Sequence, residues 1–278
     1  MKLGTYTANG DGFIPSVKVF APVQALLFDV RRVGVENFSA SSFNQLAARV
    51  NITLQNSKDG SNTPIVPYIS LRKLAEIATF NEGCVLMDSA KMLLPVMLNP
   101  AGNLSVDNDK YLDIEIHDLA ADQQVTIYAE CNDKMSDFVT KYMKMTCPAG
   151  VARSEFMVKE SDLVCFPSDG YDSIRLTYKG GLVSDRTIRE LEYDMAKNND
   201  ITAYGRDSST GGVNLNIETG NSNNPADFAG VYANASLQLI MSYGKNFVLN
   251  LINVDKIEIL RDSDSSQSFE FILGDLVK

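Results

Sequence analysis

The feature that most constrains this chain is a period-two alternation of apolar and polar residues, which recurs along its whole length. Successive side chains of a β-strand point to opposite faces, so each alternating segment predicts a strand with one buried and one wet face. Strands of this kind are typical of antiparallel sandwiches and barrels. The apolar members of six such segments are Val50/Ile52/Leu54, Leu112/Ile114/Ile116, Ile174/Leu176/Tyr178, Val213/Leu215/Ile217, Leu237/Leu239/Met241 and Phe247/Leu249/Leu251.

Two segments, residues 70–80 and 187–198, follow a helical period instead. Their apolar residues recur at the i, i+3, i+4 and i+7 spacing of an amphipathic helix. The two stripes are Leu71/Leu74/Ala75/Ala78 and Ile188/Leu191/Met195. Thr187 and Glu190 also have the spacing of a capping box, which predicts the start of the second helix.

The layout is repeated along the chain. Each half runs through strands, one helix, a loop-rich stretch and a final pair of strands, and short turn signals such as Asp59-Gly60 and Gly180-Gly181 separate them. About eight strands per half suits a jelly roll, which closes or doubles its sheet to hide strand edges. We therefore predict an all-β fold of two tandem eight-stranded jelly-roll barrels, each with one short inserted helix. The join is expected between residues 132 and 150, with domains at 1–135 and 136–278.

Composition excludes several functions. The formal net charge of −10 opposes binding to phosphate, so direct contact with nucleic acid is not expected. The first twelve residues hold only Lys2 and Asp11 as charged side chains, which is unlike a basic genome-packing arm. The sequence shows no apolar run of the roughly 18–20 residues that a membrane span needs, and no signal-peptide core.

The cysteines and the histidine do not predict a zinc site. Cys84, Cys131, Cys147 and Cys165 are scattered, and His117 is the single histidine, whereas structural zinc needs closely spaced ligand pairs. Free thiols in a reducing compartment are the expected state.

Two patterns in the sequence partly match known catalytic motifs. Ser70 and Lys73 match the S-x-x-K motif of serine β-lactamases, but the accompanying S-D-N triplet is absent, and Ser70 is better explained as a helix cap. His117 lies beside Glu115 and Asp113 on one strand, so a carboxylate–histidine relay is conceivable, although a solvated strand face accounts for it equally well. The sequence predicts no catalytic residue and no cofactor.

Acidic turns are the only candidates for a metal site. Calcium prefers carboxylate and carbonyl oxygens, which makes Asp107, Asp109 and Asp113 weak candidate ligands, together with Asp262 and Asp264. Neither group fits an EF-hand loop, and solvated turns are the competing interpretation.

The layout resembles that of a known family, the double jelly-roll major capsid proteins of small icosahedral, membrane-containing bacteriophages of the corticovirus and finnlakevirus types. The resemblance is clearest over residues 24–83, where QALLFDVRRVGV and ARVNITLQ are strands and ISLRKLAEIATFNEG is the helix. The order of strands and helices extends the resemblance over the whole chain, although the family has no invariant motif to match.

The resemblance implies a virion protein, made in the host bacterial cytoplasm, with no active site. It implies a homotrimer that forms pseudo-hexagonal capsomers, and neighbouring capsomers, minor capsid proteins, spike proteins and an internal lipid membrane as partners. In the corticovirus type, metal ions help to hold the shell. The loop-rich stretches at residues 89–110 and 205–227 are where we expect contacts between subunits and with the exterior.

Two other functions remain open from the sequence. Many jelly rolls bind or hydrolyse carbohydrate, although the absence of Trp counts against this because sugar sites favour flat aromatic platforms, for which the 11 Tyr could substitute. A receptor-binding spike head is also trimeric and β-rich, but it usually carries a shaft repeat, and none is visible here.

Overall fold

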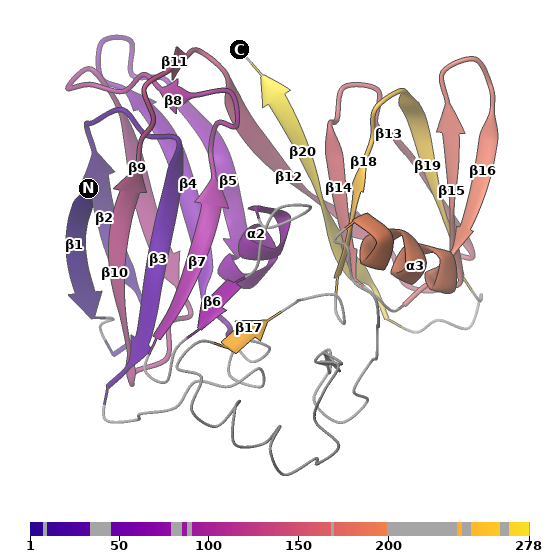
Figure 1. Ribbon diagram of the computed structural model, residues 1–278, viewed down its shortest axis with the longest axis horizontal. Coiled ribbons are helices and arrows are strands. Elements are labelled where there is room, and N and C mark those ends of the chain that lie inside the picture. Colours follow the sequence, from indigo (N-terminus) through magenta and orange to yellow (C-terminus); the bar gives the residue numbers. More distant parts are fainter. Residues whose placement is uncertain are drawn as a thin grey trace, which may run out of the picture.

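The computed structural model describes residues 1–7, 10–33, 46–78, 85–87, 91–167, 170–198, 238–240, 246–261 and 267–277 (Figure 1). Strands dominate these residues, and the helices among them are α2 and α3. No helix in this part of the chain is long and apolar enough to cross a membrane.

The first half of the chain forms two sheets. One sheet has the strand order β2 (Ile14–Val19), β9 (Lys110–His117), β4 (Arg49–Asn56), β5 (Asn62–Ser70). The other has the order β1 (Lys2–Thr7), β10 (Gln123–Glu130), β3 (Ala25–Arg32), β7 (Lys91–Met97), β6 (Val85–Met87), β17 (Gln238–Ile240). A short parallel pair joins β8 (Asn103–Leu104) to β11 (Met135–Ser136).

The second half repeats this arrangement. One sheet has the order β12 (Val139–Cys147), β20 (Phe269–Val277), β14 (Leu163–Pro167), β18 (Asn246–Asn250). The other has the order β13 (Arg153–Met157), β19 (Val254–Leu260), β15 (Ser173–Tyr178), β16 (Val183–Thr187). When the short strands β6, β8, β11 and β17 are left aside, the described strands of each half can be numbered from first to eighth along the chain. In both halves one sheet then has the order first, eighth, third, sixth, and the other has the order second, seventh, fourth, fifth. This is the jelly-roll order, so the predicted fold class is confirmed.

The two helices occupy the same place in each jelly roll, after the fifth strand. Helix α2 spans Leu71–Ala78 and α3 spans Ile188–Asn198, close to the predicted residues 70–80 and 187–198. The capping box of α3 is formed as predicted, because the Thr187 N–H donates to Glu190 Oε2 (2.8 Å) and the Glu190 N–H donates to Thr187 Oγ1 (3.3 Å). Ser70, expected as the cap of the first helix, is the last residue of β5.

The predicted alternation is seen in the described strands. Val50, Ile52 and Leu54 are buried on β4, and Leu112, Ile114 and Ile116 are buried on the neighbouring β9. The segment Val213/Leu215/Ile217 lies outside the described residues. Gly180 and Gly181 have φ of 90° and 86° in the turn between β15 and β16, a conformation that glycine adopts without steric cost.

One strand pairs differently from the sequence-based expectation. The sequence predicts that the segment around Leu239 belongs to the second jelly roll, but β17 pairs with β6 and extends a sheet of the first one. Periodicity predicts a strand and its faces, whereas the pairing partner depends on residues far away in the sequence.

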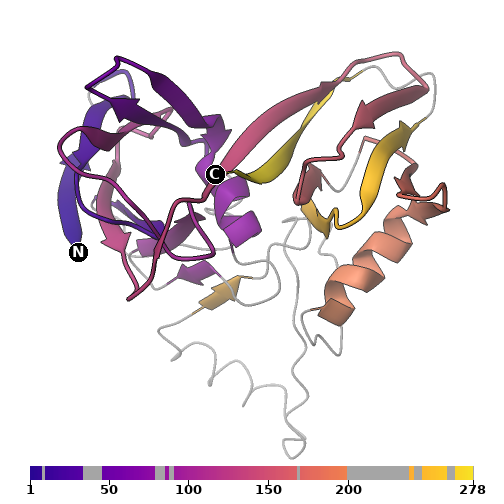
Figure 2. The same ribbon diagram turned by 90° about the horizontal axis from the view of Figure 1, so that it is seen from above.

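The two jelly rolls lie side by side, with α2 between them (Figure 2). The sheet β12–β20–β14–β18 separates two hydrophobic cores. Phe166, Phe247 and Phe271 point into the core of the second jelly roll, whereas the neighbouring residues Cys165 and Ile272 join the core of the first. Both faces of the sheet are therefore buried over much of its area, which explains the consecutive apolar residues in β14, β18 and β20.

Candidate functional site

The predicted calcium ligands of the first group do not converge. Asp107 Oδ1 accepts hydrogen bonds from the backbone N–H groups of Asp109 and Lys110, both at 2.8 Å, and these bonds lower the pKa of the Asp107 carboxyl. Asp109 forms an ion pair with Lys58 (Nζ to Oδ2, 2.7 Å), and Asp113, in the middle of β9, accepts a hydrogen bond from Ser16 (2.7 Å). Asp107 and Asp109 therefore stabilise a turn, and Asp113 lies on the face of a strand.

The second group, Asp262 and Asp264, lies outside the described residues. Over the part of the chain that the structure describes, no three His, Cys, Asp or Glu side chains are grouped as metal ligands. Calcium binding stays a prediction.

His117 lies in an aromatic and polar cluster on the outer face of β9. Its ring centroid is 4.7 Å from that of Phe13 and 4.9 Å from that of Tyr68, and its Nε2 is 3.4 Å from Glu115 Oε2. Asn51 donates a second hydrogen bond to the Glu115 carboxylate (3.0 Å). The neighbours of His117 among the described contacts are thus a carboxylate and two rings, without a serine, threonine or cysteine nucleophile.

The S-x-x-K motif is also explained by packing. Ser70 ends β5, while Lys73 extends away from it and donates a hydrogen bond from Nζ to the backbone carbonyl of Glu270 on β20 (3.3 Å). The lysine therefore contacts the second jelly roll and is not paired with the serine.

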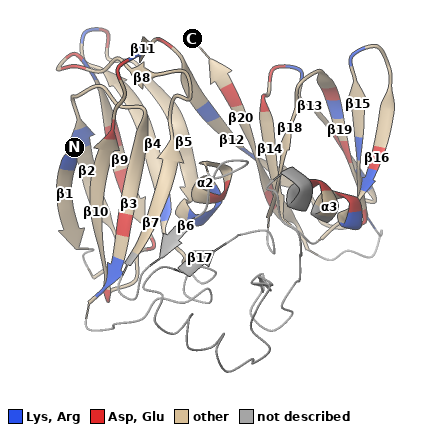
Figure 3. Ribbon diagram, viewed as in Figure 1, with Lys and Arg blue, Asp and Glu red and all other residues tan. Residues whose placement is uncertain are grey.

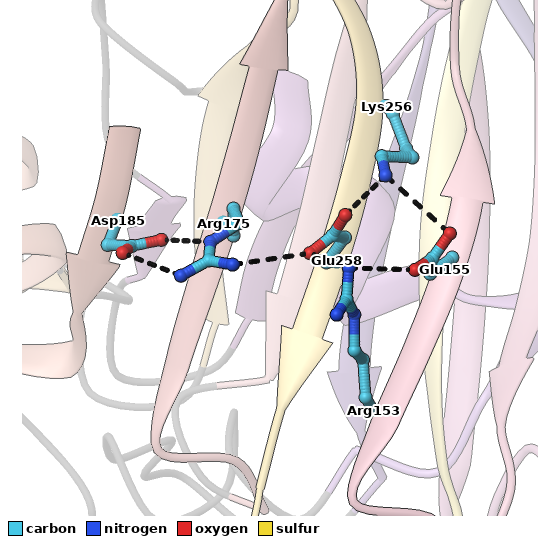
Figure 4. A network of polar contacts seen from close by, with 6 residues as sticks. All are labelled: Arg153, Glu155, Arg175, Asp185, Lys256 and Glu258. Carbon is cyan, nitrogen blue, oxygen red and sulfur yellow. Dashed lines mark hydrogen bonds and ion pairs between the residues drawn. The ribbon is translucent and has the colours of Figure 1, made fainter. Parts of the chain in front are cut away.

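The outer face of the sheet β13–β19–β15–β16 carries an extended ion network (Figure 4). At its centre is Glu258, whose side chain is 2% exposed and pairs with Lys256, with Arg153 (2.8 Å) and with Arg175 (3.9 Å). Arg175 also forms a bidentate pair with Asp185 at 2.6 and 3.0 Å. Positive and negative side chains alternate from Asp185 through Arg175 and Glu258 to Arg153 and Glu155 (Figure 4), so the network is balanced in charge and holds neighbouring strands together.

The two jelly rolls meet in an interface that combines apolar packing with polar contacts. Its apolar part comes from the outer side of β12–β20–β14–β18, which is buried in the first core. The residues are Val139, Tyr142, Cys165, Val248 and Ile272, with Leu163 and Val277 packed at the margin. Tyr142 donates a hydrogen bond to the Met97 carbonyl (2.8 Å), and burial raises the pKa of this phenol.

A polar pair lies within this interface. Glu76 on α2 is 4% exposed and accepts a hydrogen bond from the side-chain amide of Asn246 on β18, which is equally buried. Arg72, one helical turn earlier, places its Nε 4.0 Å from the Glu76 carboxylate. A buried carboxylate requires such partners, so this contact constrains how α2 sits on the second jelly roll.

Sequence reasoning missed both Glu76 and Glu258. Glu76 lies outside the apolar stripe of α2, and it is buried only because the second jelly roll covers that side of the helix. The available signal was the run of consecutive apolar residues in β14, β18 and β20, which indicates a sheet covered on both faces.

No protein-family model matches the chain, and no curated protein matches it in sequence. Among solved structures, it is similar to the major capsid protein P2 from bacteriophage PM2, with a TM-score of 0.51 and 10% identity, over 99% of this chain and 95% of that chain. The mavirus major capsid protein also matches, over 99% of this chain and 86% of that one, but a TM-score of 0.29 at 7% identity does not establish a shared fold. The PM2 likeness extends over nearly the full length of both chains, and it shows that this chain shares the fold of that phage capsid protein.

Proposed function

We propose that this protein is the major capsid protein of an icosahedral, membrane-containing bacteriophage. The observation that carries the proposal is the full-length likeness to the PM2 capsid protein, with both jelly rolls included. The protein acts by self-association and has no catalytic activity.

The arrangement of the jelly rolls supports this role. The two barrels are joined side by side by a buried interface, and their strands run in similar directions (Figure 1). Three such chains supply six barrels, which suits a homotrimer that forms a pseudo-hexagonal capsomer. We place the domain boundary at 1–135 and 136–278, within the short strand β11, because β12, which follows it, is the first strand of the second jelly roll.

The proposed location is the virion, after synthesis in the host bacterial cytoplasm. The proposed partners are neighbouring capsomers, minor capsid and spike proteins, and a lipid membrane inside the shell. Direct nucleic-acid binding is not expected from a net charge of −10. Residues 89–110 and 205–227 are proposed as contact segments. The first contains the strands β7 and β8 and is therefore not the continuous loop that the sequence predicts, and the second lies outside the described residues.

The test is native mass spectrometry of the purified protein, followed by electron microscopy of particles from its source. We expect a trimer in solution and an icosahedral shell built mostly from this chain. A glycosidase and glycan-binding screen runs in parallel. A stable monomer that cleaves or tightly binds a sugar would reject the capsid role in favour of the carbohydrate alternative.

A further inference from the structure

The interface inside the chain provides a template for a contact between chains. Within one chain, the α2 side of the first jelly roll packs on the outer side of the sheet β12–β20–β14–β18 of the second. Because both jelly rolls have the same strand order and the same helix position, each of these surfaces has an equivalent on the other jelly roll. The equivalents are the α3 side of the second jelly roll and the outer side of β1–β10–β3–β7 in the first.

Two positions of α3 can be compared with their equivalents in α2. Leu191, the fourth residue of α3, is fully buried like Leu74, the fourth residue of α2. The sixth residue of α2 is Glu76, which contacts the neighbouring sheet, and the sixth residue of α3 is Tyr193, which is 66% exposed. Figure 2 shows α2 between the jelly rolls and α3 away from the first one. An aromatic side chain therefore stands exposed where the template makes its contact.

The matching sheet surface is apolar at its centre. Tyr128, Leu27 and Pro95 are paired in register across β10, β3 and β7, and all three are partly exposed on the outer side of the sheet. Leu93 lies on the same side, next to Asp29, which is 4% exposed. The equivalent strand of the second jelly roll, β14, presents Leu163 and Cys165 to α2 and its surroundings. The charged residues on this side, Lys2, Asp29, Arg31 and Glu130, lie around the apolar row (Figure 3), so its centre suits an aromatic partner.

We propose that the α3 side of one copy binds the outer side of β1–β10–β3–β7 of a second copy, with Tyr193 as the anchor over Leu27, Pro95 and Tyr128. This inference rests on the proposed capsid function and names the surfaces that assemble the trimer. The two surfaces lie on different jelly rolls, so the contact is head to tail, and three copies close a ring in which every jelly roll repeats the template contact.

The first experiment places a charge on each side of the contact in the full-length protein. Tyr193→Asp and Leu27→Asp each bury a carboxylate without a partner, and each should weaken association by roughly tenfold or more in native mass spectrometry, as expected for a central anchor residue. The control is Leu182→Asp, which changes a 69% exposed leucine near the β15–β16 turn and should leave the trimer intact. Far-ultraviolet circular dichroism checks that all three variants keep the β fold.

The second experiment maps the partner directly. A benzophenone amino acid in place of Tyr193 is irradiated in an equimolar mixture of isotopically light and heavy protein, and mixed-isotope crosslinks identify contacts between copies. Crosslinks to residues 25–31, 91–97 or 123–130 of the other copy are expected. A wild-type trimer that survives both aspartate substitutions, or that crosslinks elsewhere, overturns this inference while the capsid role stands. A wild-type chain that never trimerises rejects the proposed function itself.

Discussion

Glu76 of α2 and Asn246 of β18 are joined by a side-chain hydrogen bond although 170 residues separate them in sequence. Each residue is only 4% exposed, and each belongs to a different jelly roll. The pair shows that the interface between the jelly rolls contains a specific polar contact as well as apolar packing. Loss of this hydrogen bond should therefore lower the free energy of unfolding, because the remaining partner stays buried without it.

Asn246→Ala should destabilise the protein by about 1–3 kcal/mol, because the Glu76 carboxylate loses a buried hydrogen-bond donor. Urea denaturation followed by tyrosine fluorescence measures the change. Asn62→Ala on β5 is the matched control, since Asn62 is exposed and its loss should stay within about 0.5 kcal/mol. Equal stability of the two variants would show that the Glu76–Asn246 bond contributes nothing.

Glu258→Gln should destabilise the protein by about 1–3 kcal/mol at pH 7, because a buried carboxylate with three cationic partners becomes neutral. The hydrogen bond from Lys256 is the main cause that lowers the pKa of Glu258, and Arg153 adds to it. The stabilisation is therefore complete above the unfolded pKa of about 4.3 and is lost as the pH falls through the lower folded value.

The measurement for Glu258 is the unfolding free energy of wild type and variant at a series of pH values. The difference between them should shrink below about pH 4. Glu155→Gln is the control, because Glu155 contacts Arg153 and Lys256 in the same network but is 49% exposed, so the change should be below about 1 kcal/mol. A difference that grows on acidification would contradict the assigned direction of the pKa shift.

Thr187→Ala should cost about 1 kcal/mol, because the first turn of α3 loses the hydroxyl that caps the Glu190 N–H. Thr187→Ser keeps that hydroxyl and should remain close to wild type. Thermal unfolding by circular dichroism compares the three proteins. If the serine variant is as unstable as the alanine variant, the capping box is not the cause.

Cys131 should react with iodoacetamide in the native protein, whereas Cys147 and Cys165 should not. Cys131 is exposed and the other two are buried, and burial raises the pKa of the Cys165 thiol, which lowers its thiolate fraction. Peptide mapping by mass spectrometry reads out each site, and full alkylation in urea shows that all three are detectable. Rapid native alkylation of Cys165 would mean that the interface between the jelly rolls opens.

If the acidic turns bind calcium between subunits, a chelator should loosen assembled particles and leave the fold of the single chain unchanged. Asp109→Asn tests the first turn, because its carboxylate pairs with Lys58 in the isolated chain. Light scattering of particles with and without chelator provides the measurement. Particles that are equally stable in both conditions would remove the calcium prediction.

Local features of this protein follow from its sequence. The alternation on β4 and β9, the apolar stripe of α2 and the Thr187–Glu190 cap involve residues within one or two turns or strands of each other, and their geometry is set by backbone periodicity. The repeated order of these elements was enough to predict two jelly rolls. Stereochemistry acts at short range, so these patterns are visible without coordinates.

Only the tertiary structure decided which remote surfaces meet. The pairing of β17 with β6, the burial of Glu76 against Asn246 and the burial of both faces of β12–β20–β14–β18 each depend on segments from the other half of the chain. The alternation of a strand predicts its two faces but not which segment covers the second face. The identity of a polar residue likewise does not show whether water or another part of the chain contacts it. The physical reason is that burial and pairing are properties of contacts between distant segments, which a local pattern does not encode.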